Sequence, residues 1–189
     1  MFIASWVTLL CCYSQHADNE NYASFGLGLI WEYPIDHAKT SHFPCVNASI
    51  ERSVLKIDSI GLFSIGLLYG ARYGYGKETH PIAYKESRID MFFVPKINFY
   101  FHSLLAPYGF PRNMSLYAGV GLGINTRSQM FEPTTDILPT PDEFVDINKI
   151  LFCGDIYLGY RYFWQKNAAA FVEIGYGLTR LKTGLVFKY

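Results

Sequence analysis

LKTGLVFKY, residues 181–189, ends the chain, and its side chains alternate between two kinds. One series is uncharged and mostly apolar: Leu181, Thr183, Leu185, Phe187 and Tyr189. The intervening positions hold Lys182 and Lys188, with Gly184 and Val186 between them. Because successive side chains of a strand point to opposite faces, the pattern predicts a β-strand with one apolar face and one charged face.

Seven earlier segments repeat this period of two. They span residues 23–33, 45–51, 63–73, 88–102, 114–125, 150–162 and 170–178. Their length is on the order of 9 to 11 residues, which lets a tilted strand cross a bilayer. An even number of alternating strands predicts an all-β fold, an eight-stranded antiparallel up-and-down transmembrane β-barrel. We expect a β-bulge at Pro95, because a closed barrel has no edge strand for a residue without an N–H.

Charged residues in these segments share one face, opposite the apolar one. They are Glu32, Glu51, Arg72, Arg88, Asp90, Lys96, Asp155, Arg161, Glu173, Arg180, Lys182 and Lys188. A soluble barrel keeps its apolar face inside, so it would have to bury these charges or expose a very large apolar surface, and both are costly. In a bilayer the apolar face meets lipid, and the closed ring satisfies the backbone hydrogen bonds.

The interior of an eight-stranded barrel is only just wide enough to be filled by side chains. We therefore expect a filled lumen, held by a structural network of ion pairs. Its expected members are Glu51, Arg72, Asp155, Arg161 and Glu173. The alternative is that the inner charges line a narrow conducting pore.

The connections between strands fall into two sets. Those expected on the outer side are 34–44, 74–87 and 127–149, with 134–146 as the longest external loop. Those expected as turns on the side of the chain ends are 53–60, 103–113 and 164–167. With the N-terminus in the periplasm, the first set faces the outside of the cell.

The composition bears on partners and cofactors. The formal net charge is zero, which indicates neither nucleic-acid binding nor a polybasic membrane anchor. No apolar run reaches the roughly 18 to 20 residues of a transmembrane helix. Cys45 and Cys153 lie on strands expected at opposite walls and have no zinc-binding spacing. We expect no metal, no cofactor and no disulfide.

Residues 1–15 are expected to be an export signal, because an apolar run from Phe2 to Cys12 precedes the small residue Ser14. No Lys or Arg precedes that run, which leaves open a start further upstream, or a buried first strand or helix in place of a signal. The barrel domain is expected over residues 22–189.

Three stretches near the end of the chain carry a resemblance to a known family: Gly159-Tyr160-Arg161-Tyr162-Phe163, Phe171-Val172-Glu173-Ile174-Gly175-Tyr176-Gly177 and Gly184-Leu185-Val186-Phe187-Lys188-Tyr189. They resemble the closing hairpin of the small outer-membrane β-barrel family of Gram-negative bacteria. Ser64-Ile65-Gly66-Leu67 and Tyr69-Gly70-Ala71-Arg72-Tyr73 are similar to its third strand.

The resemblance implies a location in the bacterial outer membrane, in contact with its lipid and lipopolysaccharide. It also implies insertion by the barrel-assembly machinery, whose signal is an alternating last strand that ends in an aromatic residue. Leu185, Phe187 and Tyr189 fit that signal. We expect a monomer.

For function, the sequence favours a non-enzymatic surface protein whose barrel anchors external loops for adhesion or ligand interaction. Two alternatives stay open, an enzyme that modifies the acyl chains of lipid A and a narrow channel. The nearest catalytic candidate is His102-Ser103, which has no evident acid partner. His37, His42 and His80 are expected in loops.

Overall fold

A computed structural model describes residues 20–29, 39–57, 60–78, 84–133 and 145–189. The strands within these ranges are β1 (Asn21–Leu29), β2 (Lys39–His42), β3 (Cys45–Ile57), β4 (Gly61–Glu78), β5 (Tyr84–Tyr100), β6 (Met114–Pro133), β7 (Val145–Gln165), β8 (Ala168–Tyr176) and β9 (Leu181–Lys188). Two short helices, α2 (His102–Leu105) and η2 (Ala106–Tyr108), connect β5 to β6. No helix of the described residues is long and apolar enough to cross a membrane.

Eight of these strands form a closed ring. Each pairs antiparallel with its neighbours in the order β4-β3-β1-β9-β8-β7-β6-β5, and β5 returns to β4. The short strand β2 pairs with β4 beyond the start of β3 and continues that wall. Phe43, between β2 and β3, keeps the pairing by donating its N–H to the carbonyl of Tyr73 at 3.1 Å. The predicted eight-stranded antiparallel up-and-down barrel is therefore confirmed.

The ring closes where β9 pairs with β1. Their register runs from Tyr22↔Lys188 to Leu29↔Leu181, and Tyr189 donates its N–H to the carbonyl of Asn21 at 3.0 Å. Val186 is buried, whereas its neighbours Leu185 and Phe187 are exposed. The alternation in the last strand thus separates a lumen side from an outer side.

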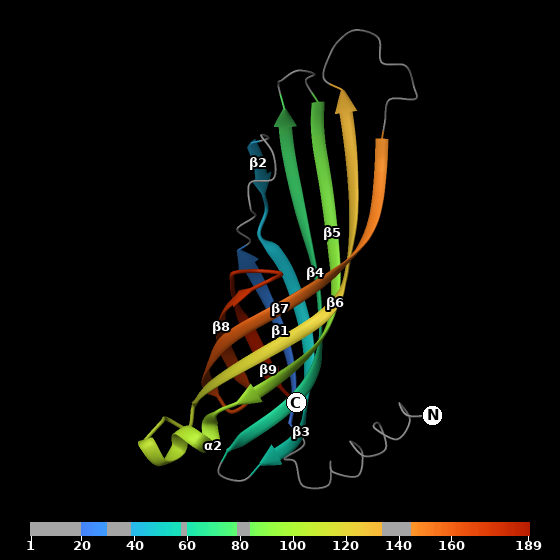
Figure 1. Ribbon diagram of the computed structural model, residues 1–189. Helices are drawn as coiled ribbons and strands as arrows, with labels where there is room; N and C mark the ends of the chain where they lie inside the picture. Colours follow the sequence, from blue (N-terminus) through green and yellow to red (C-terminus); the bar gives the residue numbers. More distant parts are fainter. Residues whose placement is uncertain (1–19, 30–38, 58–59, 79–83, 134–144) are drawn as a thin grey trace, which may run out of the picture.

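Four strands are much longer than the sequence pattern predicts. β4, β5, β6 and β7 have 18, 17, 20 and 21 residues, whereas β1, β8 and β9 have 9, 9 and 8. Figure 1 shows the four long strands rising beyond the rest of the barrel, at the end away from the C-terminus. Much of 74–87 and 127–149, expected as loops, is therefore strand, because pairing continues to Tyr84↔Pro133 and Phe131↔Val145.

At the opposite end, the connections also differ from those predicted. β3 continues to Ile57 and β4 begins at Gly61, so the turn expected over 53–60 is much shorter. The connection expected over 103–113 contains η2 and all of α2 except its first residue, His102. Between β7 and β8, Lys166 and Asn167 form a tight turn within the expected 164–167.

Pro95 causes no bulge, so that prediction was wrong. On one side it pairs with Leu67 of β4. On the other side the ladder between β5 and β6 stops after Phe93↔Ile124 and resumes at Lys96↔Gly121, three residues further along both strands. The missing proline N–H is therefore accommodated by a gap in the ladder, and the register is kept.

The turn between β8 and β9 sends one side chain into the lumen. Gly177 has a φ of 132°, and a Cβ there would lie 2.1 Å from the carbonyl oxygen of Gly154. Alternation along the predicted segment 170–178 puts Leu178 on the same outer face as Val172, Ile174 and Tyr176, but Leu178 is 8% exposed and packs inside the barrel. The alternation fails at Leu178 because Gly177 ends the strand geometry on which it depends.

We predict that Gly177→Ala destabilises the barrel by about 1 to 3 kcal/mol, because the new Cβ both meets backbone and opposes the positive φ. Gly154→Ala is the matched control, since its Cβ would meet Leu122 Cδ2 at 3.5 Å and the carbonyl oxygen of Gly121 at 3.8 Å, both ordinary contact distances. Urea unfolding in lipid vesicles, followed by tryptophan fluorescence, measures both. Equal unfolding free energies for the two variants would contradict the prediction.

Candidate functional site

The lumen is the candidate functional site, because the buried charged side chains of the described strands occupy its inward positions. They are Glu51, Asp90, Lys96, Asp155, Arg161, Glu173 and Lys182. Burying a charge is costly unless it is paired and hydrogen-bonded. Their partners therefore decide what the lumen can do.

Glu51 on β3 is the centre of one layer. Its Oε2 lies 2.9 Å from Nη2 of Arg161 on β7 and 3.7 Å from Nζ of Lys96 on β5. The hydroxyl of Ser64 donates to its Oε1 at 2.5 Å, and the hydroxyl of Tyr100 donates to the same oxygen. This carboxylate thus joins strands from several sides of the barrel.

Tyrosine rings surround the guanidinium of Arg161. Its Cζ lies 5.0, 5.2 and 4.6 Å from the ring centroids of Tyr22, Tyr100 and Tyr117. Nε and Nη1 of Arg161 have no hydrogen-bond partner among the described residues. Because the face of an aromatic ring attracts a cation, the rings offset part of the cost of burying these atoms.

Lys182 on β9 is the centre of a second layer. Its Nζ lies 2.5 Å from Asp155 Oδ2 and 3.2 Å from Glu173 Oε2, and 4.6 Å from the ring centroid of Tyr157. The hydroxyl of Tyr117 donates to Glu173 at 2.7 Å. Since Tyr117 also contacts Arg161, the two layers form one connected network.

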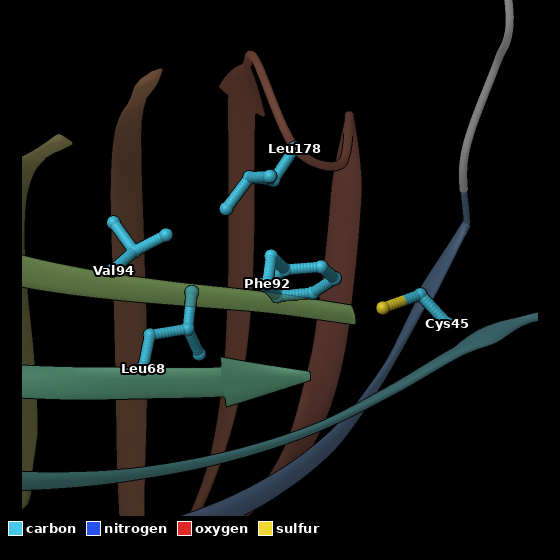
Figure 2. Close-up of a cluster of buried hydrophobic side chains, with 5 residues drawn as sticks. All are labelled: Cys45, Leu68, Phe92, Val94 and Leu178. Atoms are coloured by element: carbon cyan, nitrogen blue, oxygen red, sulfur yellow. The ribbon is translucent and has the colours of Figure 1, made fainter. Parts of the chain in front are cut away.

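Apolar side chains form a cluster beside these charges, shown in Figure 2. Leu178 comes from the β8–β9 turn and packs with Phe92 and Val94 of β5. Leu68 and Cys45 complete the buried cluster, and Cys153 packs against it. Cys45 and Cys153 are both free thiols. Together with buried Tyr100, Tyr117 and Tyr157, this cluster fills the lumen with side chains at these levels.

Three arginines converge on Asp90 of β5. Arg72 Nε lies 2.5 Å from its Oδ2, Arg88 Nη2 lies 2.8 Å from the same oxygen, and Arg127 Nε lies 2.9 Å from Oδ1. Asp90 is buried, whereas the arginine side chains are 13 to 20% exposed. This carboxylate thus has its own set of cations, distinct from those that pair with Glu51 and Glu173.

The five predicted network residues therefore fall into two groups. Glu51 and Arg161 pair directly, and Lys182 bridges Asp155 and Glu173. Arg72 instead pairs with Asp90 in the arginine cluster. Alternation gives the face of a residue but not its level along a tilted barrel, and the role of these five residues as one structural network stays a prediction.

Three buried lumen charges, Asp90, Lys96 and Lys182, were not among the five named network residues, although the alternation of the last strand predicts that Lys182 points inward toward acids such as Glu173. Each of the three lies at an inward-facing position of its strand, the same criterion by which the five named residues were chosen. For Lys182 a further signal was present, because folding residues 168–187 as a hairpin places it directly opposite Glu173. Oppositely charged cross-strand pairs of this kind stabilise a sheet.

Other predicted residues have the following positions. Leu185, Phe187 and Tyr189 lie on the outer side of the last strand, and their role in assembly stays a prediction. His102 and Ser103 belong to α2, but their side chains lie outside the described part, as do those of His37, His42 and His80. Within the described ranges, no group of three His, Cys, Asp or Glu side chains could hold a metal ion.

No family model matches the chain, and none of the curated proteins matches it. Solved structures of small outer-membrane barrels do match. The outer membrane protein OprG from Pseudomonas aeruginosa is 10% identical with a TM-score of 0.51, over 92% of this chain and 97% of its own. Ail, the attachment invasion locus protein of Yersinia pestis, solved with the heparin analogue sucrose octasulfate, is 10% identical with a TM-score of 0.48, over 91% and 95%.

A third match is the N-terminal β-barrel domain of Pseudomonas aeruginosa OprF. It is 14% identical with a TM-score of 0.45, over 92% of this chain and 100% of that domain. At these identities the likeness to OprG shows a shared barrel fold and carries no activity to this chain.

We predict that Glu51→Gln lowers the free energy of unfolding by about 3 to 5 kcal/mol, because it leaves the buried cations Arg161 and Lys96 without their carboxylate. Lys166→Gln, at the exposed turn between β7 and β8, is the control and should change stability by less than about 0.5 kcal/mol. Urea unfolding in lipid vesicles measures both. A Glu51→Gln barrel as stable as the control would show that the network contributes little.

Proposed function

We propose that this chain is an integral protein of the bacterial outer membrane, in which a barrel with a filled lumen anchors a surface-exposed extension for adhesion or ligand interaction. One observation supports this proposal above all. The charged side chains of the barrel face inward and the apolar ones face outward, whereas a soluble barrel has its apolar face inside.

The outer surface supports a membrane location. Large apolar side chains are exposed all around the described ring, including Phe25, Ile97, Leu122, Ile156 and Ile174 at 60, 51, 79, 64 and 65%. Contiguous apolar patches on soluble monomers rarely exceed a few hundred Å², so a surface of this extent calls for lipid. A closed strand ring is one of the two structures that can span a bilayer with every backbone group satisfied.

The orientation follows from the two ends of the barrel. The end near the C-terminus has the tight turn at Lys166 and Asn167, while the other end carries the long extension of β4 to β7 (Figure 1). Barrels of the outer membrane have short periplasmic turns and longer extracellular loops. We therefore place the extension outside the cell.

The extension supplies a binding surface. β7 pairs with β8 only from Ile156 onward, so no described strand pairs with the second edge of β7 over residues 145–155. An unpaired strand edge can take up an extended polypeptide through backbone hydrogen bonds. Ile150 and Phe152 on this segment are 75 and 97% exposed, which would give such a ligand apolar contacts.

The filled lumen supports an anchor rather than a channel. Tyr100, Tyr117, Tyr157 and Arg161 are at most 4% exposed and occupy the interior between the walls. Eight strands leave little room beyond such side chains. Ion flow would require the buried pairs around Glu51 and Lys182 to separate.

We predict that the protein fractionates with outer membranes and migrates faster on a gel before boiling than after it, because a closed barrel resists detergent until heated. Cell fractionation combined with this heat-modifiability gel is the measurement. A soluble protein that migrates identically before and after boiling would overturn the proposed location.

We also predict that Asn148→Cys reacts with a membrane-impermeant maleimide on intact cells, whereas Asn167→Cys reacts only after the envelope is permeabilised. Both positions are exposed, one on the extension and one at the opposite turn. The native cysteines are replaced by alanine in both variants. The reverse labelling pattern would place the extension in the periplasm and remove the proposed surface role.

A further inference from the structure

Arg52 is a charged residue on the outer surface of the barrel, where the other outward-facing side chains of the described strands are mostly apolar. It lies between the inward-facing residues Glu51 and Ser53 and is exposed. Among the described side chains of the barrel strands, it is the one cation at an outward-facing position. Its backbone pairs with β1 and β4, but no hydrogen bond or ion pair joins its guanidinium to a described residue, in contrast to the buried cations of the lumen.

Arg52 lies at the rim that the barrel has on the side of β1, near the C-terminus, while β3 and β4 pair on beyond it to Ile57↔Gly61. It pairs with Asn21 at the start of β1, and the carbonyl of Asn21 accepts the N–H of Tyr189. Outward-facing Phe63 and Phe99 lie nearby on β4 and β5, with ring centroids 4.7 Å apart and ring planes tilted by 49°. Aromatic side chains gather where the hydrocarbon of a bilayer meets its headgroups, so in the proposed membrane location we expect Arg52 at headgroup depth.

An apolar groove begins at Arg52 and Tyr189 on the outer surface. Its walls include Ile50, Ile65, Leu67, Ile97, Val120 and Leu122, and its volume is about 670 Å³. Pro95 lies within it, at the gap in the ladder between β5 and β6. The groove thus joins a cationic end at the rim to an apolar wall at hydrocarbon depth.

We propose that this groove holds one phospholipid, with an acyl chain along the apolar wall and the phosphate on the Arg52 guanidinium. The cationic end of the groove matches the phosphate of such a molecule, and the apolar walls match its acyl chain. Guanidinium groups form strong, charge-assisted hydrogen bonds to phosphate. The inference rests on the proposed membrane location, and the periplasmic end of the barrel faces the leaflet that contains phospholipid.

The experiment compares two lipids that differ in the phosphate. The folded barrel, stripped of lipid in mild detergent, is titrated with dioleoylphosphatidylglycerol or with dioleoylglycerol, and native mass spectrometry counts the bound molecules. We predict that the protein prefers the phospholipid by about fivefold, because one arginine near an anionic headgroup contributes about that factor.

Variants assign this preference to Arg52. Arg52→Gln should abolish it and Arg52→Lys should keep part of it, whereas Arg112→Gln, an exposed arginine after η2 at the same end of the barrel, should leave it unchanged. Val120→Trp should weaken the binding of both lipids by filling the groove, and should keep the ratio between them. Migration of each variant on the heat-modifiability gel verifies that it has folded.

The site is overturned if Arg52→Gln keeps the full preference for the phospholipid, or if lipid A binds more tightly than the phospholipid in the same titration. Either result can occur with a barrel that is heat-modifiable and resides in the outer membrane. Loss of the site and loss of the proposed location are therefore separate outcomes.

Discussion

Pairing between β1 and β9 is the constraint on which the rest of the structure depends. Without it, the outer edges of both strands would present unpaired N–H and C=O groups, each of which costs several kcal/mol in hydrocarbon. The register from Tyr22↔Lys188 to Leu29↔Leu181 leaves neither edge free. On its other edge β9 pairs with β8, which places Lys182 beside Glu173, so the strand that closes the ring also brings lumen charges into contact.

A ring of this size forces a choice between small and large residues inside. A Cβ on Gly159 would lie 2.2 Å from Cζ of Tyr117, and a Cβ on Gly119 would lie 2.4 Å from Cζ of Tyr157. Each tyrosine therefore occupies space that a neighbouring glycine leaves empty. The hydroxyls gained in this way reach Glu173 and Asn98, so the packing of the rings and the satisfaction of the polar groups are one arrangement.

The face that each side chain takes could be predicted from the sequence. Charged and small residues alternate with large apolar ones along each strand, and the two kinds occupy opposite faces. Strand length could not be predicted, since β4 to β7 continue to pair beyond the level at which β8 ends, and their loops read as polar connections. Alternation also does not give the partners of the lumen charges. Arg72 and Arg161 both occupy inward positions of their strands, yet Arg72 pairs with Asp90 and Arg161 pairs with Glu51. The predicted face of Leu178 was wrong for a local reason, because the positive φ of Gly177 ends the alternation there.

Charge inside and apolar surface outside also make the register specific. A slip of one residue in any strand would turn its inward charges to the outer face and its large apolar residues into the lumen. Glu51 and Arg52 show the limit of this rule, since adjacent charged residues must face opposite ways. The carboxylate takes the lumen, where Arg161 and Lys96 compensate it. The guanidinium takes the outer face, and only a position at the rim lets it reach polar headgroups, as charged side chains near the ends of membrane spans do.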